Sequence, residues 1–326
     1  MVGDRQFSVG RSDHLDHNYS TTVTKRILVT GVAGFIGSSV AKRLLADGYE
    51  VVGVDDLSSG KMDMVPVGVD FVEVDLAAPG VASKLPRDIL QIFHLAGQSS
   101  GEISFDDPVS DLQKNTVSTL NLINYAIETP VEKILYASSM SVYGETADAP
   151  VAESSRPLPL SCYGVGKLAS ENYLKVFASR VPYVSLRMFN VYGPGQDMSN
   201  LRQGMISIYL AQALNGKKIT IRGSLDRFRD FIYIDDVVEA WMQASTRADV
   251  VNSCINVATG VRTTVAEVTD LISSLLPGVE IETSDPTPGD QTGIYADCSR
   301  ARELLGLDSY VELSTGLRRF LEYLQK

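Results

Sequence analysis

The chain has 326 residues, of which 44% are hydrophobic and 21% are charged. This composition is typical of a globular protein of one large or two interlocked domains, and it excludes a mainly disordered chain. The formal net charge of −11 disfavours a nucleic-acid partner, because the chain repels a phosphate backbone. No apolar run reaches the ~20 residues that span a bilayer, and Cys162, Cys254 and Cys298 show no metal-ligand spacing and cannot all pair within the chain. We therefore expect a soluble, cytoplasmic protein with no metal site and no membrane partner.

The first two thirds of the chain alternate between short apolar runs and segments of helical periodicity. Residues 1–24 come before this pattern and carry no signal-peptide core, so we expect a flexible tail there. The expected strands are 26–30, 50–54, 69–74, 91–95, 133–137 and 183–189, and the expected helices are 35–46, 108–128 and 161–180. Such alternation predicts an α/β fold with a doubly wound parallel sheet that is covered by helices on both faces.

After about residue 194 the pattern loosens. Helices are expected at 205–214, 235–245 and 263–276, and short strands at 218–221, 254–257 and 279–282. We therefore predict one domain over residues 25–193 and a smaller mixed α/β C-terminal lobe over most of residues 194–326. The two are expected to share a cleft.

A glycine-rich turn follows the first expected strand. In Thr30-Gly-Val-Ala-Gly-Phe-Ile-Gly37, Gly31 permits a tight turn, Gly34 lets a pyrophosphate approach the backbone, and Gly37 lets the helix lie close to the sheet. The N-terminus of that helix would present free N–H groups to the phosphates. The strand, the spacing and the helix together predict that residues 25–193 form a Rossmann-type domain that binds a dinucleotide.

Asp55 ends the second expected strand, at the place where an acidic residue meets the adenosine ribose. A carboxylate there accepts hydrogen bonds from the ribose hydroxyls and repels a 2′-phosphate. At ~4 Å and an effective dielectric constant near 20, each like charge costs on the order of 4 kcal/mol. Asp55 therefore predicts NAD rather than NADP, whereas Asp56 alone also fits an ordinary turn aspartate.

Tyr163 and Lys167 are four residues apart, on one face of an expected helix. A neighbouring ammonium and the positive charge of a nicotinamide would both lower the pKa of the phenol, so that Tyr163 can act as a base. Ser138 and Ser139 follow the expected strand 133–137, at the carboxyl edge of the sheet where ligands bind. The hydroxyl of Ser139 can hold a substrate oxygen while Tyr163 takes its proton.

These motifs resemble the extended short-chain dehydrogenase/reductases, specifically their group of NAD-dependent nucleotide-sugar epimerases and dehydratases. The matching segments occur in family order and are 30–37, 55–60, 75–76, 94–97, Asn115, 138–144, 163–167, 187–196 and 229–236. The resemblance extends over nearly all of the chain from residue 25. It implies that Ser139, Tyr163 and Lys167 are the catalytic residues and that His94 is structural.

The resemblance also implies a set of binding residues. Besides Gly31, Gly34, Gly37, Asp55, Tyr163 and Lys167, NAD would be bound by Phe35, Ile36, Asp56, Ser59, Gly60, Asp75, Leu76, Leu95, Ala96, Gly97, Asn115 and Ser138. A nucleoside-diphosphate sugar, with UDP the expected nucleotide, would be bound by Ser139, Tyr163, Asn190, Arg229 and Asp290. The family's typical homodimer pairs the helices expected at 108–128 and 161–180.

The two residues that follow Ser139 indicate which reaction to expect. The 4,6-dehydratases of the group carry an acid–base Asp-Glu pair there, decarboxylating relatives a Glu, and reductase/3,5-epimerase relatives a Cys, whereas this chain has Met140 and Ser141. Neither side chain transfers protons usefully near neutral pH. The expected activity is therefore C4 epimerisation of a nucleotide sugar through a transient 4-keto sugar. A 4,6-dehydratase or another 4-keto-forming enzyme is the alternative, and a non-catalytic NAD-binding sensor is a further one.

The sugar is left open by the sequence. Thr287 stands where related epimerases usually have an arginine, two residues before Gly289, and the family's size-gate position aligns with Ile294. Isoleucine is neither clearly small nor clearly large. A UDP-hexose, a UDP-N-acetylhexosamine and a UDP-hexuronic acid are therefore all compatible with the sequence.

Overall fold

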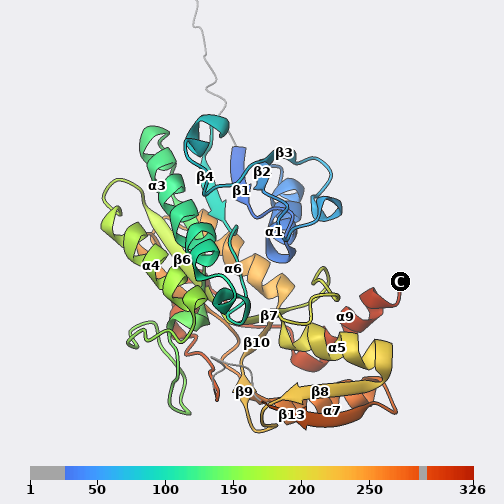
Figure 1. Ribbon diagram of the computed structural model, residues 1–326. Coiled ribbons are helices and arrows are strands. Elements are labelled where there is room, and N and C mark those ends of the chain that lie inside the picture. The colour runs from blue at the N-terminus through green and yellow to red at the C-terminus, as the bar shows by residue number, and fades with distance from the viewer. Residues whose placement is uncertain (1–25, 286–291) are drawn as a thin grey trace, which may run out of the picture.

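The computed structural model describes residues 26–285 and 292–326, and its centre is a seven-stranded parallel sheet (Figure 1). The strands are β1 (Arg26–Thr30), β2 (Glu50–Asp55), β3 (Asp70–Glu73), β4 (Gln91–His94), β5 (Ile134–Ser139), β6 (Tyr183–Met188) and β11 (Ser253–Val257). Their order is β11-β6-β5-β4-β1-β2-β3. The order reverses between β1 and β4, which creates a crevice at the carboxyl ends of the strands, where α/β proteins of this kind bind ligands.

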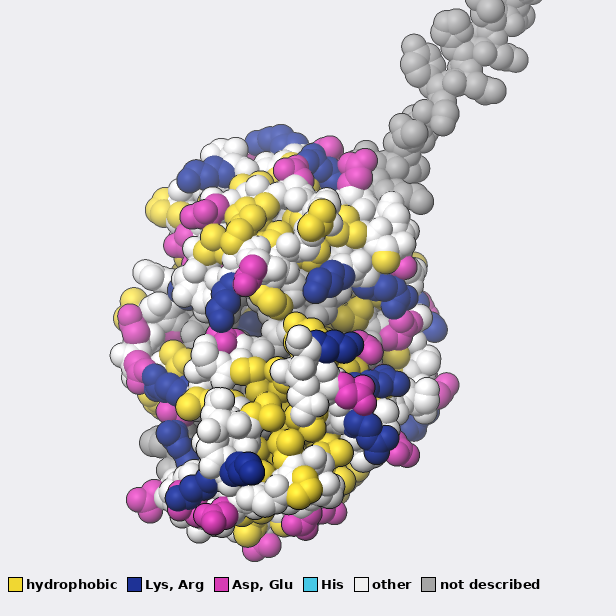
Figure 2. All heavy atoms as spheres, turned by 90° about the vertical axis from the view of Figure 1, so that its right-hand side faces the viewer, with side chains coloured by type: hydrophobic (Ala, Val, Ile, Leu, Met, Phe, Trp, Pro, Cys, Tyr) yellow, Lys and Arg dark blue, Asp and Glu magenta, His cyan; other side chains and the backbone are white. Residues whose placement is uncertain are grey.

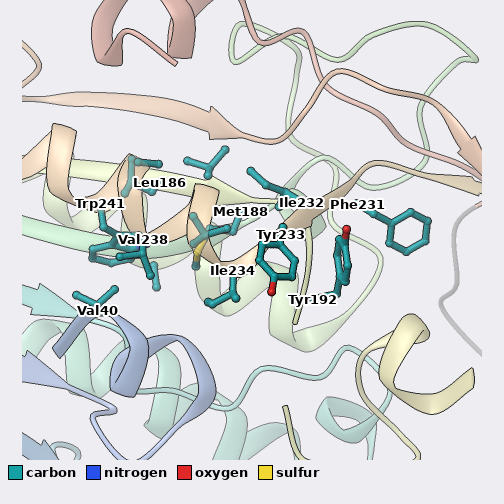
Figure 3. Packing of buried hydrophobic residues seen from close by; sticks show 14 of the residues in the cluster. Val40, Leu186, Met188, Tyr192, Phe231, Ile232, Tyr233, Ile234, Val238 and Trp241 are labelled. Carbon is teal, nitrogen blue, oxygen red and sulfur yellow. The ribbon is translucent and has the colours of Figure 1, made fainter. Parts of the chain in front are cut away.

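Helices cover both faces of the sheet. On one face, α1 (Phe35–Ala46) and α6 (Ile234–Thr246) bury residues such as Val40 and Trp241 in one apolar cluster with strand residues such as Leu186 (Figure 3). On the other face, α3 (Ser118–Glu128) and α4 (Cys162–Val176) pack on the opposite side chains of the same strands (Figure 1). This arrangement confirms the predicted doubly wound fold.

The segment expected as one helix over 108–128 consists of three parts. It begins as α2 (Pro108–Leu112), winds as a π-helix over Gln113–Val117, and continues as α3. The wider turn buries Asn115 and Thr116. Such π-helical insertions are often found at functional sites, and this one lies against α4, which carries Tyr163 and Lys167.

A second lobe lies below the sheet in Figure 1. It contains α5 (Met205–Gly216), α7 (Val265–Leu275) and the parallel pair β8 (Lys218–Arg222) and β13 (Glu280–Ser284). Two short pairs connect it to the sheet: β7 (Asn190–Tyr192) with β10 (Phe231–Tyr233), which is parallel, and β9 (Phe228–Arg229) with β12 (Thr263–Thr264), which is antiparallel. The cluster of Figure 3 continues through Tyr192 and Tyr233 from the sheet into this region.

The structure differs from the sequence-based expectation at the C-terminal end. The helices α8 (Ser299–Leu305) and α9 (Leu313–Leu324) were not predicted. The strand expected at 254–257 is present as β11, but it pairs with β6 at the edge of the main sheet. Residues beyond 193 therefore complete the sheet as well as forming the second lobe.

Acidic and basic side chains are interspersed on the face turned to the viewer in Figure 2. The net charge of −11 is therefore not gathered into one acidic patch on that face. Within residues 26–285 and 292–326, no helix is both long enough and apolar enough to cross a lipid bilayer.

Candidate active site

A cleft of about 1120 Å³ lies between the carboxyl ends of the sheet strands and the second lobe. Most predicted binding residues line it, namely Gly31, Gly34, Phe35, Ile36, Gly37, Asp55, Asp56, Ser59, Gly60, Asp75, Leu76, Leu95, Ala96, Gly97, Ser138, Ser139, Tyr163, Lys167, Asn190 and Arg229. Asn115 is buried behind this wall, against Gly97. Asp290 and Thr287 lie outside the described residues.

The glycine turn leaves room for a pyrophosphate. Gly31 has a φ of 71°, and a Cβ there would lie 2.7 Å from the backbone nitrogen of Ala96. A Cβ on Gly37 would lie 2.0 Å from the carbonyl oxygen of Gly31, so this helix can approach the strand only with glycine. The N-cap of α1 is Gly34, which supplies no side-chain cap, so the first N–H groups of the helix remain available to an anion. These features fit the pyrophosphate of a dinucleotide.

Asp55 lies at the end of β2 with only 8% of its surface exposed. Its Oδ2 accepts a hydrogen bond from the backbone N–H of Ala33 at 3.0 Å, and its Oδ1 accepts one from Leu57 at 2.9 Å. Each oxygen keeps a further lone pair for a ribose hydroxyl. A Cβ on Gly60 would lie 3.0 Å from Oδ1, so glycine at this position keeps the carboxylate accessible. Burial raises the pKa of Asp55, against the two backbone hydrogen bonds, which lower it.

The catalytic candidates meet where α4 approaches the end of β5. The hydroxyl of Ser161 caps α4 by accepting the N–H of Gly164 at 3.1 Å, and the next turns place Tyr163 and Lys167 on one face. The Lys167 Nζ lies 5.7 Å from the centre of the Tyr163 ring and 5.1 Å from that of the Tyr136 ring. Ser139, at the end of β5, lies near enough to Tyr163 to lower the pKa of its phenol. The three predicted catalytic residues are thus in one place.

Burial determines the electrostatics of Tyr163 and Lys167 in the protein without cofactor. In the protein alone, burial raises the pKa of Tyr163 to about 12, although the nearby Ser139 lowers it. Burial also lowers the pKa of Lys167 to about 8, against the carboxylate of Asp111, which raises it. The lysine alone therefore does not make the phenol a base near neutral pH.

His94 behaves as a structural residue, as expected. Its Nδ1 is 2.8 Å from the hydroxyl of Thr30, and its Nε2 is 3.0 Å from that of Thr119. Burial, together with the charge of Lys167, lowers the pKa of His94 to about 3. The ring is therefore neutral at physiological pH and links β4 to β1 and α3 behind the cleft.

The two residues after Ser139 have no acid–base function in this geometry. The Met140 sulfur accepts a hydrogen bond from the Asn190 side chain at 3.4 Å. The Ser141 hydroxyl lies 3.2 Å from the Ser139 hydroxyl, and the Ser141 N–H donates to the latter at 3.1 Å. Both side chains line the cleft, but neither carries the carboxyl group that an elimination needs there.

A buried ion pair, between Glu171 and Arg187, lies next to the end of β5. Glu171, on α4, accepts hydrogen bonds from the Ser138 hydroxyl at 2.5 Å and from Arg187 at 2.6 and 2.9 Å. Arg187, on β6, also donates to the Tyr143 hydroxyl at 3.0 Å. This network fixes the strand ends that carry Ser138 and Ser139, and sequence analysis did not identify Glu171.

Arginines form part of the wall of the cleft in the second lobe. Arg229 is 4% exposed and donates to the carbonyl of Phe228 at 2.8 Å. Burial and the nearby Arg227, which is also buried, lower the pKa of Arg229 to about 10. From the sequence alone, Arg227 and Arg229 could be surface charges, but both side chains are buried, which excludes that interpretation. A guanidinium in such a wall suits a phosphate group.

Ion pairs bridge the mouth of the cleft. Lys61, from the loop after β2, pairs with Asp197 of the second lobe at 3.2 Å. Arg202, from the same part of the second lobe, pairs with Glu102 at 3.0 Å and with Asp106 at 2.6 Å. The segment from 197 to 202 is therefore held on both sides of the opening, which the sequence did not reveal.

Ile294 does not occupy the place expected of a size gate. It is fully buried in a small apolar cluster with residues such as Val142 and Phe189, and it is not among the residues that line the cleft. Met140 packs against this cluster and faces the cleft instead. Residue 294 therefore does not line the cleft in this conformation.

The fold is that of an NAD-binding α/β protein of the Rossmann type, and its cleft brings Ser139, Tyr163 and Lys167 together. Comparison with known proteins agrees with the fold and with the cofactor. The profile of the NAD dependent epimerase/dehydratase family matches residues 27–258. The chain belongs to this family, which depends on NAD.

Three relatives illustrate the range of the family. The UDP-glucose 4-epimerase of Mycolicibacterium smegmatis is 36% identical over 312 residues, which are 91% of this chain and 98% of the relative. UDP-glucuronic acid decarboxylase 1 of Xenopus tropicalis is 30% identical over 310 residues, 93% of this chain and 72% of the relative. The crystal structure of the UDP-glucose 4-epimerase of Thermus thermophilus in complex with NAD has a TM-score of 0.85 at 34% identity and covers 92% of this chain and 99% of that one.

Proposed function

We propose that this protein is an NAD-dependent UDP-sugar 4-epimerase. The observation that carries the proposal is the cleft centre itself: Ser139, Tyr163 and Lys167 are together, whereas Met140 and Ser141 replace the groups needed to eliminate water or carbon dioxide. UDP is supported as the nucleotide of the substrate by relatives that are named as enzymes of UDP-glucose and UDP-glucuronic acid.

Each residue has a defined task in this mechanism. When bound in the cleft, NAD would supply the acceptor for a hydride from C4 of the sugar and the donor that gives it back. Tyr163 takes the proton of the C4 hydroxyl, and Ser139 donates a hydrogen bond to the same oxygen. Lys167 keeps positive charge beside the phenol and is placed to bind the nicotinamide ribose. The 4-keto sugar then turns over, so that the hydride returns to its other face and Tyr163 gives the proton back.

The binding roles follow from the walls of the cleft. Asp55 accepts the adenosine ribose hydroxyls, and the N-terminus of α1 binds the pyrophosphate of NAD. Asn190 and Arg229 are placed to bind the diphosphate of the UDP-sugar from the opposite wall. Because each turnover restores the cofactor, NAD is expected to stay bound during purification.

We further propose that the protein is a homodimer. The neighbouring helices α2 and α4 expose apolar side chains, Val109 and Leu112 on the first and Val165, Tyr173 and Val176 on the second. An apolar surface on two packed helices suits an isologous contact.

Proton NMR in deuterated water tests the reaction. With UDP-glucose, UDP-N-acetylglucosamine and UDP-glucuronic acid as substrates, one or more should give a C4-epimer pair at equilibrium, with hydrogen retained at C5. A growing C6 methyl doublet would show a dehydratase, and a UDP-pentose formed from UDP-glucuronic acid would show a decarboxylase. No product from these or from GDP- and CDP-sugars, together with no change in the absorbance of bound NAD, would favour a sensor or a substrate not among those tried. Tyr163→Phe is the matched inactive control.

A further inference from the structure

A buried carboxylate lies one layer behind the catalytic centre. Asp111, on α2, is 2% exposed. Its Oδ1 accepts hydrogen bonds from the side chains of Gln98 at 2.9 Å and Asn115 at 3.1 Å, whereas its buried Oδ2 has no hydrogen-bond partner among the described residues. A buried carboxyl group with an unsatisfied oxygen either takes up a proton or needs a positive charge that compensates its own. Burial raises the pKa of Asp111, whereas the charge of Lys167 and the hydrogen bonds from Gln98 and Asn115 lower it and favour the carboxylate.

The positive charge nearest to this arrangement is Lys167. Asn115 lies between the two side chains. Its amide nitrogen donates to Asp111, and its Oδ1 has no hydrogen-bond partner among the described residues. A Cβ on Gly97 would lie 2.5 Å from that Oδ1 and 3.3 Å from the Lys167 Nζ, so the two atoms border the same small space. On the other side, Gly166 of α4 packs against this arrangement, since a Cβ there would lie 3.2 Å from the Asn115 Cβ and 3.4 Å from the Asp111 Oδ2.

The other groups around Lys167 carry no free negative charge. The rings of Tyr136 and Tyr163 flank its ammonium group. Burial raises the pKa of Tyr136, and His94 is neutral because its pKa is about 3. The carboxylate of Glu171, one turn further along α4, is used by its buried ion pair. Within the described part of the chain, Asp111 is therefore the carboxylate that faces Lys167 without an ion pair of its own.

We propose that Asp111 is a positioning residue, whose buried carboxylate, held by Gln98 and Asn115, keeps the ammonium group of Lys167 beside Tyr163. This inference rests on the roles that the proposed function gives to Tyr163 and Lys167. The charge acts on both residues in the same direction, because a nearby negative charge stabilises an ammonium and destabilises a phenolate. Asp111 accordingly raises the pKa values of both Lys167 and Tyr163.

The consequence is a shift of the whole pH profile. Activity rises with pH as Tyr163 loses its proton and falls as Lys167 loses its proton. Asp111→Asn removes the charge but keeps an oxygen for the hydrogen bonds from Gln98 and Asn115. Both limbs of the kcat profile should therefore move to lower pH, by about one unit, the shift that a single nearby charge typically causes.

Two further variants separate charge from structure. Asp111→Glu keeps the charge, so its limbs should stay at the parental pH even if its maximal rate falls. Asp107→Asn removes a carboxylate from the same helix, one turn earlier and exposed, where Asp107 caps α2 by accepting the N–H of Ser110 at 2.9 Å. Asparagine is an equally good N-cap, so this variant should leave the profile unchanged.

A readout without substrate keeps the test independent of the proposed reaction. The ultraviolet difference absorbance between the NAD-bound protein and its Tyr163→Phe variant follows the ionisation of Tyr163 directly. Its midpoint should be lower by about one pH unit in the Asp111→Asn background. This measurement can be made even if no UDP-sugar is turned over, so a failure of the epimerase proposal is distinguishable from a failure of this one.

The results that would overturn the proposal are definite. If Asp111→Asn lowers the rate or the melting temperature but leaves both limbs and the tyrosine midpoint in place, Asp111 is a structural residue only. If the two limbs of the kcat profile move in opposite directions along the pH axis, the result contradicts the expectation that Asp111 shifts the pKa values of Tyr163 and Lys167 in the same direction. If Asp111→Asn does not fold, displaced limbs in Asp111→Glu contradict the proposal, because that variant keeps the charge.

Discussion

Replacing Asp55 by asparagine should abolish most of the preference for NAD over NADP. The carboxylate is almost completely buried, so water screens it little, and its two oxygens are fixed toward the cleft by the N–H groups of Ala33 and Leu57. At ~4 Å and an effective dielectric constant near 20, a single 2′-phosphate charge beside it costs about 4 kcal/mol. This corresponds to roughly a thousandfold weaker binding of NADP by the parent protein.

Calorimetric titration of nucleotide-free protein with NAD and NADP measures this ratio. In Asp55→Asn it should fall to roughly tenfold or less, mainly through tighter binding of NADP. Glu73→Gln is the matched control, because Glu73 is the register partner of Asp55 on β3 but is exposed and does not line the cleft. Equal affinities in the parent protein, or an unchanged ratio in Asp55→Asn, would refute the electrostatic reasoning.

Three further variants test the centre, its support and the proposed interface. Tyr163→Phe should lower turnover by ~10²-fold or more while NAD stays bound, and substantial residual activity would exclude the phenol as the base. Glu171→Ala leaves the Arg187 guanidinium buried without its partner, so the free energy of unfolding in urea should fall by about 3–5 kcal/mol; an unchanged midpoint would contradict this. Val165→Glu should produce a monomer in light scattering that still binds NAD, whereas an intact dimer would place the interface elsewhere.

The strands of the main sheet could be predicted because each is a short apolar run between turns. Buried on both faces, a strand such as β1 contains a continuous apolar run, from Ile27 to Val29, and is recognisable without its neighbours. The position of β11 could not be predicted in the same way, since pairing with β6 is a long-range contact that local periodicity does not encode. The C-terminal helices α8 and α9 were not predicted either. The shorter of them, α8, buries Ala301 and Leu305 in the apolar cluster of Figure 3.

Some features of the candidate site could likewise be predicted from the sequence, and others could not. The positions of Ser139, Tyr163 and Lys167 followed from spacing and from the end of a strand. The upward shift of the Tyr163 pKa could not be predicted in this way, because it depends on how deeply the side chain is buried in the folded protein. Glu171 carried an overlooked signal, since it continues the four-residue spacing of Tyr163 and Lys167 along α4. Asp111 carried none, because an acidic residue in the first turn of a helix is ordinary.

The pairing of β11 with β6 has a consequence for how the chain folds during synthesis. β6 is buried along its whole length, and its outer edge is covered only when residues 253–257 have been made. Until then a nascent chain that ends near residue 193 presents an apolar strand with unpaired N–H and C=O groups, which invites pairing with another chain. It also lacks Trp241, which stacks on Phe93 of β4 with the ring centres 5.7 Å apart. One edge of the nucleotide-binding half therefore stays uncovered during synthesis until residues 253–257 have been made.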